Sequence, residues 1–487
     1  MRTRQDKRGS IALQKPDKKL LPPAVLELIA HLQAAGHQAC LAGGCVRDML
    51  MGKKPQDWDI ASSASPEQVE NLFEHTYAVG RAFGVVVVLM GAEAYEIASF
   101  RGDGAYLDGR HPEEVYFGSM SEDVKRRDFT VNALLYDPLS EQLHDLVGGL
   151  KDLQNRLLRA VGQANQRFQE DRLRILRALR FAANLEFDIE ADTWQALCAA
   201  RDGIGLISQE RIAGELEKML CGAHSQTAFR LLESSGLLEL ILPELAALRH
   251  IEQPPEFHPE GDVWQHTLLL LRELDLVLRD CTTEPAAPRF NQGRLYRCSE
   301  TEKRILAWGA LLHDVAKPRC FERRERIRFH GHESLGAEMC QEILTRLRQP
   351  RVLIKRTGEL VRLHMSLSNF EQMRPAVKIR YLQEEDFPLL LELHRMDCLA
   401  SHGDLTLHAQ ILQAWHEEQK RPKASPPLLN GKDLINMGYE PGPEFKNILE
   451  AVRIQQLENK LNDKQEAINW VIQKFPEKRT QKDKQSD

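Results

Sequence analysis

Apolar residues alternate with polar ones, or form short runs, chiefly in the first third of the chain. Four such stretches are QACLAGG (38–44), DWDIASS (57–63), GVVVVLM (84–90) and AYEIASF (94–100). Alternation and short apolar runs of this length are typical of strands. Helical apolar spacing precedes these stretches in residues 21–36 and interrupts them in residues 65–77. The pattern predicts a small mixed sheet with helices, an α/β domain that ends near residue 150.

Beyond Leu150, apolar residues recur at i, i+3 and i+4 almost to the end of the chain, which is the spacing of amphipathic helices. Segments with this spacing are 167–185, 208–220, 225–241, 263–278 and 335–348. Residues 282–297 lack periodicity and predict an exposed loop, while the Pro- and Lys-rich residues 420–431 predict a linker. The expected order is a disordered leader (1–20), an α/β head (21–150), a helical neck (151–240), a helical domain (241–420), a tail (421–475) and a disordered C-terminus (476–487).

Composition narrows the class of protein. A length of 487 residues corresponds to about three domains. No stretch approaches the ~20 apolar residues of a membrane span, so we expect no membrane partner. The N-terminal MRTRQDKRGSIALQKPDKK is basic and lacks the apolar segment of a secretory signal, which makes the cytoplasm the expected compartment. Nine cysteines without a C-x-x-C pair predict reduced thiols rather than a disulfide framework or a zinc ribbon.

Charge alone disfavours a nucleic-acid partner. The net charge is −6, whereas neutralising phosphates normally draws on a strongly basic surface. Local basic clusters could still bind phosphates. They are Lys125–Arg127, the arginines at 172, 174, 177 and 180, and the Lys-rich end of the chain.

Two carboxylates follow a pair of glycines in the segment LAGGCVRDMLMGKKPQDWDIAS (41–62). We expect a strand to end at Gly43 and Gly44, and a second strand to carry Asp57 and Asp59 on one face. Glycines let a triphosphate approach the backbone. The N-terminus of the following helix supplies N–H donors, and Arg47 is within reach.

Glu96, on the predicted strand AYEIASF, can join Asp57 and Asp59. Such a carboxylate set can hold two Mg²⁺ ions, which activate an attacking 3′-hydroxyl and stabilise the leaving pyrophosphate. A D-x-D pair alone is a weak signal, but the full run G-G-x-x-R-D followed by D-x-D is specific. We therefore predict that these three residues are catalytic and that Asp57 and Asp59 bind the metal.

Residues 43–61 resemble the signature of polymerase β-like nucleotidyltransferases, and in particular of class II tRNA nucleotidyltransferases, the family of CCA-adding enzymes and bacterial poly(A) polymerases. RRDFTVNALLYD (126–137) is similar to the family's second motif. This resemblance implies that Arg127 and Asp128 contact the ribose and phosphates, with Asn132 nearby. A ribose 2′-hydroxyl can donate to Asp128, which would favour ribonucleotides.

QEDRLRILRALRFA (169–182) resembles the family's protein template, E-D-x-x-R, which Glu170, Asp171 and Arg174 match. Arg177 follows one helical turn later and joins the expected nucleotide-binding set. Asp171 and Arg174 are three residues apart on a predicted helix and so share a face. A carboxylate acceptor beside a guanidinium donor matches the edge that C and A present, whereas U and G present the reverse.

A second set of candidate ligands lies in the helical domain. WGALLHDVAKP (308–318) places His313 and Asp314 at the end of an apolar helix and resembles the metal-binding pair of HD phosphohydrolases. The further candidates, in the order of that superfamily, are His266 upstream and His332, His364 and Asp397 downstream. Such ligands suit a transition metal such as Ni²⁺, Mn²⁺ or Fe²⁺, with water attacking a phosphate ester. His330 is an alternative to His332.

The resemblance covers residues 38 to 475, although Lys446 stands where the family has glycine. It implies template-independent addition of CMP, CMP and AMP, from CTP and ATP, to the 3′ end of tRNA. It also implies that the HD domain removes a 3′-terminal phosphate or opens a 2′,3′-cyclic phosphate. The alternatives are an A-adding enzyme with a separate CC-adding partner, a poly(A) polymerase, and an HD phosphohydrolase whose head only binds RNA. The sequence predicts no oligomeric state.

Two segments of the head bear on these alternatives. YAVGRAFGVVVV (77–88) contains Gly80, Arg81 and Phe83 but lacks the doubled basic residue associated with bacterial poly(A) polymerases. GDGAYLDGRHPEEV (102–115) has three glycines and no periodicity, which predicts a mobile loop. In the class II family a flexible element here is associated with the switch from C to A, which disfavours a CC-only enzyme.

Overall fold

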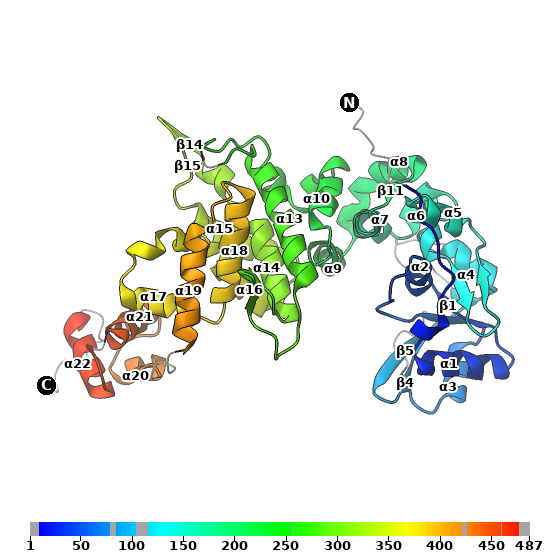
Figure 1. Cartoon of the computed structure of the whole chain (residues 1–487), viewed down its shortest axis with the longest axis horizontal. Helices are drawn as coiled ribbons and strands as arrows, with labels where there is room; N and C mark the ends of the chain where they lie inside the picture. Colours follow the sequence, from blue (N-terminus) through cyan, green and yellow to red (C-terminus); the bar gives the residue numbers. More distant parts are fainter. Residues whose placement is uncertain are drawn as a thin grey trace. The chain divides into compact units, whose positions relative to one another are not determined.

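The computed structural model describes residues 9–77, 84–103, 115–256, 258–420, 426–458 and 460–476. The chain divides into two compact units (Figure 1). The first consists of residues 1–246 with 346–349, and the second of residues 247–345 with 350–487. None of the helices in these described ranges is long and apolar enough to cross a membrane.

The first unit begins with a seven-stranded mixed sheet in the order β3-β4-β5-β2-β1-β8-β9. Its strands are β1 (Ala39–Ala42), β2 (Ile60–Ser62), β3 (Thr76–Tyr77), β4 (Val85–Met90), β5 (Glu93–Ser99), β8 (Leu135–Asp137) and β9 (Gln142–His144). β2 and β5 are parallel, with Ile60 opposite Ile97, and the other neighbours are antiparallel. The predicted α/β head is confirmed.

Helices cover the sheet because its apolar side chains alternate. On β4, Val86 and Val88 are buried while their neighbours are partly exposed. The covering helices are α1 (Pro23–Ala34), α2 (Gly44–Leu50) and α3 (Pro66–Leu72), and α1 and α3 are seen beside β4 and β5 in Figure 1. A short hairpin of β6 (Arg101–Asp103) and β7 (Val115–Phe117) leads to α4 (Met120–Arg126).

Residues 9–20 differ from the predicted disordered leader. The backbone N–H of Ile11 donates to the carbonyl of Gln154, and that of Gln14 donates to the carbonyl of Leu50. Residues Lys18–Leu20 form a short 3-10 helix. Backbone hydrogen bonds to α2 and to Gln154 thus fix a segment whose polar composition gave no sign of it, and residues 1–8 lie outside the described residues.

The neck is built from short helices. They are α5 (Gly149–Gln154), α6 (Ala164–Glu170), α7 (Leu173–Leu185), α8 (Ala191–Ala200), α9 (Gln209–Leu220), α10 (Ser225–Ser234), α11 (Leu237–Ile241) and α12 (Pro243–Ala246). α7 packs against both α9 and α10, and the apolar side chains of Ile175, Leu176 and Leu179 are fully buried.

The second unit is helical around a buried core that contains Trp264 and Trp308. Its main helices are α13 (Val263–Asp280), α14 (Glu300–Leu312), α15 (His332–Arg346), α16 (Arg351–Leu363), α17 (Pro375–Gln383), α18 (Phe387–Ala400) and α19 (Thr406–Lys420). α14 packs closely on α16 because Gly309 has no side chain. A Cβ there would lie 2.6 Å from a methyl carbon of Leu360.

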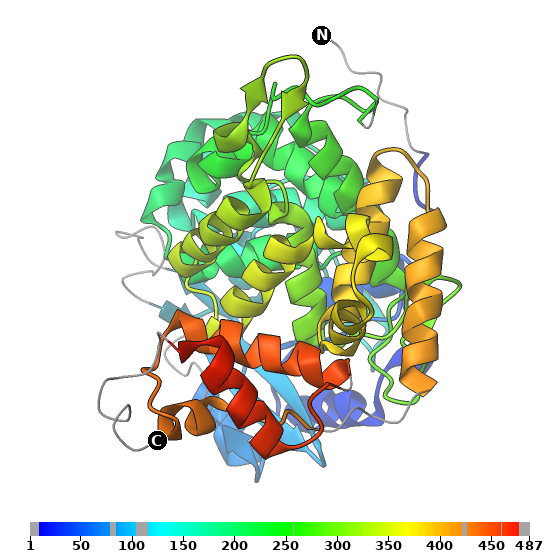
Figure 2. The ribbon, with the colours of Figure 1, turned by 90° about the vertical axis from the view of Figure 1, so that its left-hand side faces the viewer.

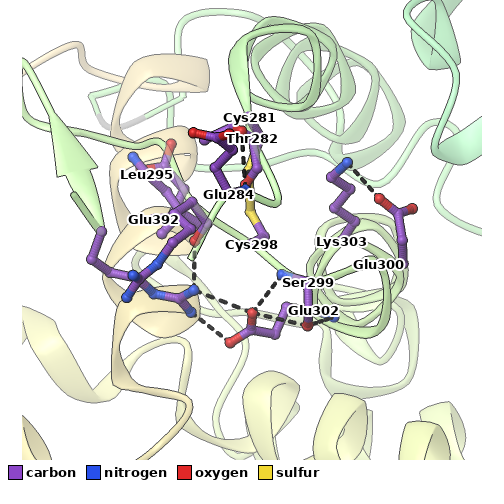
Figure 3. The surroundings of a disulfide bond; sticks show 12 residues. Cys281, Thr282, Glu284, Leu295, Cys298, Ser299, Glu300, Glu302, Lys303 and Glu392 are labelled. Carbon is purple, nitrogen blue, oxygen red and sulfur yellow. Dashed lines mark hydrogen bonds and ion pairs between the residues drawn. A yellow bond between two sulfur atoms is a disulfide. The ribbon is translucent and has the colours of Figure 1, made fainter. Parts of the chain in front are cut away.

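The segment 282–297 is more ordered than the exposed loop that we predicted. It contains a small hairpin of β12 (Phe290–Asn291) and β13 (Arg294–Leu295), in which Leu295 is buried and its N–H donates to Glu392 at 2.8 Å. The hairpin brings the Cα atoms of Cys281 and Cys298 within 6.4 Å, and the two residues form a disulfide (Figure 3). The expectation of reduced thiols is therefore wrong for this pair, whose approach depends on a chain reversal that cysteine spacing does not reveal.

The tail forms a small core of its own from α20 (Gly431–Asn436), α21 (Pro443–Leu457) and α22 (Lys464–Lys474), which are drawn in orange to red in Figure 2. Its buried residues include Leu434, Ile448 and Val471. α21 packs on α17, where Arg380 pairs with Glu450. Residues 421–425 of the predicted linker and residues 477–487 lie outside the described residues.

Candidate active sites

Asp59 and Glu96 occupy matching positions on two neighbouring strands of the head. Asp59 directly precedes Ile60 on β2, as Glu96 precedes Ile97 on β5, and Ile60 pairs with Ile97. The two isoleucines are buried, so the carboxylates project from the opposite, exposed face. Asp57 and Asp59 lie before β2 rather than on it, which corrects the predicted strand. Tertiary register, and not alternation within one strand, brings Asp59 and Glu96 together.

The pKa of Asp59 is raised above its usual value. Partial removal of water by the surrounding protein is the largest cause, and the negative charge of Glu96 is the next. Arg127 opposes the shift and Asp57 adds to it. Asp57, Asp59 and Glu96 do not form a group with ligand atoms within 4.8 Å of one another. The strand register places Asp59 near Glu96, and the repulsion from Glu96 and Asp57 that raises the pKa of Asp59 shows that both charges lie near it. Repulsion between adjacent carboxylates is what a divalent cation would relieve.

Gly43 makes room for the guanidinium of Arg127. Its φ is 75°, a left-handed conformation that glycine adopts without strain, and a Cβ would lie 3.2 Å from Nη1 of Arg127. Asp123 holds Arg127 through an ion pair of 2.9 Å, and also pairs with Arg126 at 2.7 Å. Gly44, the first residue of α2, lies next to Arg47, with 3.7 Å from its ideal Cβ position to Nη2.

Asn132 and Asp128 connect the second motif to the helix start and to the neck. Nη1 of Arg47 donates to Oδ1 of Asn132 at 2.5 Å, and Asn132 donates to Asp128 at 3.4 Å. Arg177 on α7 pairs with Asp128 at 2.6 Å. Burial alone would raise the pKa of Asp128, but the charge and hydrogen bonds of Arg177 lower it below its usual range. The carboxylate of Asp128 is thus ionised, and it connects the second motif to Arg177, which lies 49 residues later in the chain.

The template residues are not on one helix as predicted. α6 ends at Glu170 and α7 begins at Leu173, and Asp171 between them has an extended backbone. Oδ1 of Asp171 accepts the N–H of Leu173 at 3.1 Å. This local side-chain bond competes with helical continuation and explains the break.

Ion pairs fix each template residue. Glu170, which we predicted to bind nucleotide, is buried between Arg174 at 2.9 Å and Arg167 at 2.6 Å. Arg174 also donates to the carbonyl of Arg126 at 2.9 Å. Arg211 of α9 holds Asp171 at 3.0 Å. The segment 208–220 therefore contacts a predicted template residue directly.

Phe181 was not predicted and lies among three arginines of the site. Arg180, Arg177 and Arg47 stand over its ring, with Cζ atoms 4.2, 5.2 and 5.6 Å from the centroid. Arg180 is tied to Glu215 of α9 at 2.6 Å. The sequence signal that could have indicated Phe181 is its position as an aromatic residue within an arginine-rich helix. Gly80, Arg81, Phe83 and most of the loop 102–115 lie outside the described residues.

In the second unit, four imidazoles converge on Asp314 at the end of α14. Oδ1 of Asp314 is 3.4 Å from Nε2 of His332 and 3.8 Å from Nε2 of His364, and Oδ2 is 3.1 Å from Nε2 of His313. Nε2 of His266 lies 3.9 Å from Asp314 and 3.0 Å from Asp397. All six predicted residues thus meet, while the alternative His330 is exposed.

Each imidazole is oriented through its other nitrogen. Nδ1 contacts a carbonyl three residues earlier in His313 (Ala310, 2.9 Å), His332 (Phe329, 2.8 Å) and His364 (Val361, 2.6 Å). In His266 the partner is Oε1 of Glu260 at 2.8 Å. Such contacts keep a proton on Nδ1 and direct Nε2 toward Asp314, where a metal would bind Nε2 in place of any proton on it.

Two residues of this site were missed. Glu260 contacts Nδ1 of both His266 and His258. Lys317 lies one turn beyond the HD pair, and its ammonium is 2.7 Å from Asp314 and donates to Gln253 at 2.7 Å. Glu260 stands in an irregular segment six residues before His266, where no periodicity marks it. Lys317 belongs to the segment WGALLHDVAKP, in which nothing distinguishes it from a surface lysine.

The pKa values reflect this crowding. Burial would raise the pKa of Asp314, but His313 and Lys317 lower it well below its usual value. Burial would lower the pKa of His266, yet Asp397 and Glu260 raise it to about 9. Burial and the charge of His313 lower the pKa of His364 to about 3. Carboxylates are therefore ionised and His364 is neutral near pH 7.

The donor set fits a transition metal. The buried Nε2 atoms of His266 and His313 make no well-formed hydrogen bond to any described residue. Two groups of close ligand atoms share Asp314, one with His266 and His313 and one with His332 and His364. Mixed imidazole and carboxylate ligands suit ions such as Ni²⁺, Mn²⁺ or Fe²⁺.

Comparison with protein families gives three matches along the chain. Residues 39–159 match the poly A polymerase head domain, and residues 263–401 match the HD domain. Residues 186–248 match the family described as "Probable RNA and SrmB- binding site of polymerase A". The three matches correspond to the head, the neck and the second unit.

Curated relatives agree with these matches. The CCA-adding enzyme of Streptococcus thermophilus is 31% identical over 454 residues, which are 92% of this chain and 96% of that protein. The CCA-adding enzyme of Bacillus velezensis is 44% identical over 229 residues, or 47% of this chain. That alignment spans only 57% of the relative's own length.

Solved structures share the fold. The Bacillus stearothermophilus CCA-adding enzyme in complex with CTP superposes with a TM-score of 0.62 and 25% identity, covering 94% of this chain and 99% of that one. The Thermotoga maritima CCA-adding enzyme complexed with tRNA_CCA gives a TM-score of 0.52 at 19% identity, with 95% and 99% covered. At that identity the second match is a likeness of fold alone.

Proposed function

The chain belongs to the family of CCA-adding enzymes, and on this basis we propose that it adds CMP, CMP and AMP to the 3′ end of tRNA without a nucleic-acid template. CTP and ATP are the proposed nucleotide substrates, pyrophosphate is the product, and the cytoplasm is the proposed compartment. The observation that carries the proposal is the parallel register that sets Asp59 beside Glu96, next to Gly43 and Arg127.

Asp57, Asp59 and Glu96 would hold Mg²⁺, whose charge neutralises the triphosphate and favours ionisation of the attacking 3′-hydroxyl. The 3′-oxygen of the RNA attacks the α-phosphorus of the nucleotide, and the bond to pyrophosphate breaks. Arg127, aimed past Gly43, and Arg47, at the start of α2, provide positive charge for the phosphates. Asp128, kept ionised by Arg177, can accept a hydrogen bond from the ribose 2′-hydroxyl.

Asp171 and Arg174 are proposed to read the base. The guanidinium and the carboxylate offer a donor and an acceptor to the edge of C or A. Their anchoring to Arg211 and to Glu170 supports a rigid template, because fixed groups discriminate without a reorganisation cost.

A second activity rests on a separate observation, the four Nε2 atoms aimed at Asp314. We propose that the second unit is a phosphohydrolase that depends on a transition metal. The metal would be held by His266, His313, Asp314, His332, His364 and Asp397. The metal would polarise a phosphate oxygen and lower the pKa of a water. The substrate of this phosphohydrolase would be an RNA end that carries a 3′-terminal phosphate or a 2′,3′-cyclic phosphate.

An addition assay tests the first proposal. The protein is given tRNA that lacks its CCA end, tRNA-C, tRNA-CC or an unrelated RNA, each with radiolabelled CTP or ATP. We expect CMP on the first two substrates and AMP on the third, with little use of the unrelated RNA. Addition of AMP alone to tRNA-CC would favour an A-adding enzyme. Long AMP tracts on unrelated RNA would favour a poly(A) polymerase.

A further inference from the structure

A short hairpin leaves the metal-binding cluster of the second unit and returns to it. β14 (Glu322–Arg323) and β15 (Ile327–Arg328) are antiparallel, with Glu322 opposite Arg328. The hairpin follows Asp314 by one 3-10 turn and ends four residues before the start of α15. Both of its ends are therefore anchored at the cluster, and Figure 1 shows its strands extending away from the helices of their unit.

The hairpin is strongly basic in an otherwise acidic chain. The twelve residues KPRCFERRERIR (317–328) contain six lysines and arginines and two glutamates, a net charge of +4, whereas the whole chain carries −6. Every side chain from Glu322 to Arg326 is exposed, as is Arg328. Arg323 pairs with Glu252 and Arg324 with Glu322. Within the described part of the chain, Arg326 and Arg328 have no ion pair.

Two phenylalanines and Lys317 connect the base of the hairpin to Asp314. At the base, the rings of Phe321 and Phe329 pack with centroids 5.9 Å apart. The ammonium of Lys317 lies 5.2 Å from the Phe329 centroid and 2.7 Å from Asp314. The carbonyl of Phe329 contacts Nδ1 of His332 at 2.8 Å. The same few residues thus link the exposed arginines to the groups that would bind the metal.

We propose that this hairpin is an RNA-binding arm of the HD site. Arg326 and Arg328 bind backbone phosphates of a single-stranded 3′ end and direct its terminal phosphate toward Asp314. This inference rests on the proposed phosphohydrolase function. An RNA strand is favoured over other anionic partners because the arm ends at a cluster suited to a phosphate ester. The arm can bind backbone phosphates while the cluster binds the terminal phosphate of the same RNA. Guanidinium groups bind phosphate through two parallel N–H donors.

The test compares the full chain with two double variants. Arg326→Ala with Arg328→Ala removes the two arginines that lack an ion pair. The control, Arg351→Ala with Lys355→Ala, removes two exposed cations at the start of α16. His364 follows the other end of α16, about 20 Å from Arg351 and about 14 Å from Lys355 at 1.5 Å per residue. The probe is an eight-nucleotide RNA that ends in a 2′,3′-cyclic phosphate, and its Kd is measured by fluorescence anisotropy at several salt concentrations.

We expect the arm variant to bind the RNA at least threefold more weakly. The slope of log Kd against log salt should fall by about 1.4, because each single-strand phosphate contact contributes about 0.7. The control should match the unmodified protein. Equal affinity and equal slope in the arm variant would overturn the inference, as would the same loss in the control.

Hydrolysis gives a second measurement on the Ni²⁺- or Mn²⁺-loaded protein. In the arm variant, kcat/KM for the RNA should fall at least threefold, while kcat/KM for 2′,3′-cyclic AMP stays unchanged. Equal losses on both substrates would show damage to the metal site and would overturn the arm. If the unmodified protein hydrolyses neither substrate, the phosphohydrolase proposal fails, and the binding measurement alone decides whether the hairpin binds RNA.

Discussion

Asp171 and Arg211 form an ion pair across the neck, with Nη2 of Arg211 3.0 Å from Oδ2 of Asp171. The pair connects the proposed template to α9, which lies 40 residues later. Arg180 and Glu215 make a second link between α7 and α9 at 2.6 Å. These two links hold α7 and α9 together around Asp171, the residue that we propose reads the base.

The ion pair leads to a prediction about base selection. Asp171→Asn keeps the size of the side chain but replaces an acceptor with a group that can also donate, and it removes the charge that Arg211 binds. We expect misincorporation of UMP and GMP to rise by about ten- to a hundredfold, because one good base contact discriminates by about 1–3 kcal/mol. Single-nucleotide addition assays with all four NTPs measure this.

Asp188→Asn is the matched control, because Asp188 is an exposed aspartate of the same unit. It should leave base selection unchanged. If Asp171→Asn is as accurate as the control, Asp171 serves only to start α7.

A second prediction concerns the independence of the two sites. Asp59→Asn removes a negative charge from the carboxylate set and should reduce incorporation of both CMP and AMP by more than a hundredfold, since such electrostatic stabilisation dominates phosphoryl transfer. Release of phosphate by the HD site should persist. The converse variant, His313→Ala with Asp314→Ala, should lose phosphate release and retain addition. Loss of addition in that variant, with its circular dichroism unchanged, would contradict independent sites.

Glu260 leads to a third prediction, about metal affinity. Its contact with Nδ1 of His266 at 2.8 Å fixes the ring so that Nε2 faces Asp314 and Asp397. Glu260→Ala should weaken binding of Ni²⁺ or Mn²⁺ by about ten- to a hundredfold, the usual effect of losing such a partner. Isothermal titration of the metal-free protein measures this, with Glu256→Ala as a control at an exposed glutamate nearby. Unchanged affinity would mean that the Glu260 contact does not position the ligand.

The sequence predicted the HD residues but not what orients them. His313 and Asp314 are adjacent in the chain, and the resemblance to HD phosphohydrolases selected His266, His364 and Asp397 and left His332 with one alternative. Glu260 could not be selected because it acts through His266 from an irregular segment. The choice between His330 and His332 also needed the structure, because two histidines separated by one residue fit the same spacing.

In the head, the sequence predicted the carboxylates but misplaced their backbone. Alternation suggested that Asp57 and Asp59 share a strand, whereas β2 begins only at Ile60. The helix break at Asp171 was missed for a related reason. Apolar periodicity continues through residues 167–185, and a single side-chain bond to the N–H of Leu173 overrides it.

A fourth prediction concerns Cys281 and Cys298. In protein exposed to air, mass spectrometry without reduction should find peptides that contain both residues joined. In a reducing compartment the two thiols would stay reduced, although they lie close to each other. Closing a loop across 17 residues stabilises a fold by about 3 kcal/mol, so the oxidised second unit should resist urea better than the reduced one. Complete alkylation of both thiols in the unreduced native protein would contradict the disulfide.

The last prediction separates CCA addition from its partial variants. β6 and β7 form a paired stem, with Arg101 opposite Phe117 and Gly102 opposite Tyr116. A Cβ on Gly102 would lie 2.3 Å from the ring of Tyr116, so a larger residue there would displace that exposed side chain. Residues 104–114 connect the two strands and include most of the predicted flexible element. Replacing residues 104–114 with two glycines shortens the connection to two residues and keeps the paired stem.

We expect this shortened protein to add CMP at a nearly normal rate and to stop at tRNA-CC. The carboxylates, Arg127 and the template residues are all outside the deleted segment, so binding of CTP should survive. Flexible loops can close over a site and complete it for one substrate, which is the role that the sequence predicts for residues 104–114 with ATP. Denaturing gels that resolve tRNA-C, tRNA-CC and tRNA-CCA measure the outcome, with a variant carrying an equally long Gly-Ser replacement of residues 104–114 to separate length from sequence. Normal AMP addition by both variants would show that the segment has no part in the switch from C to A.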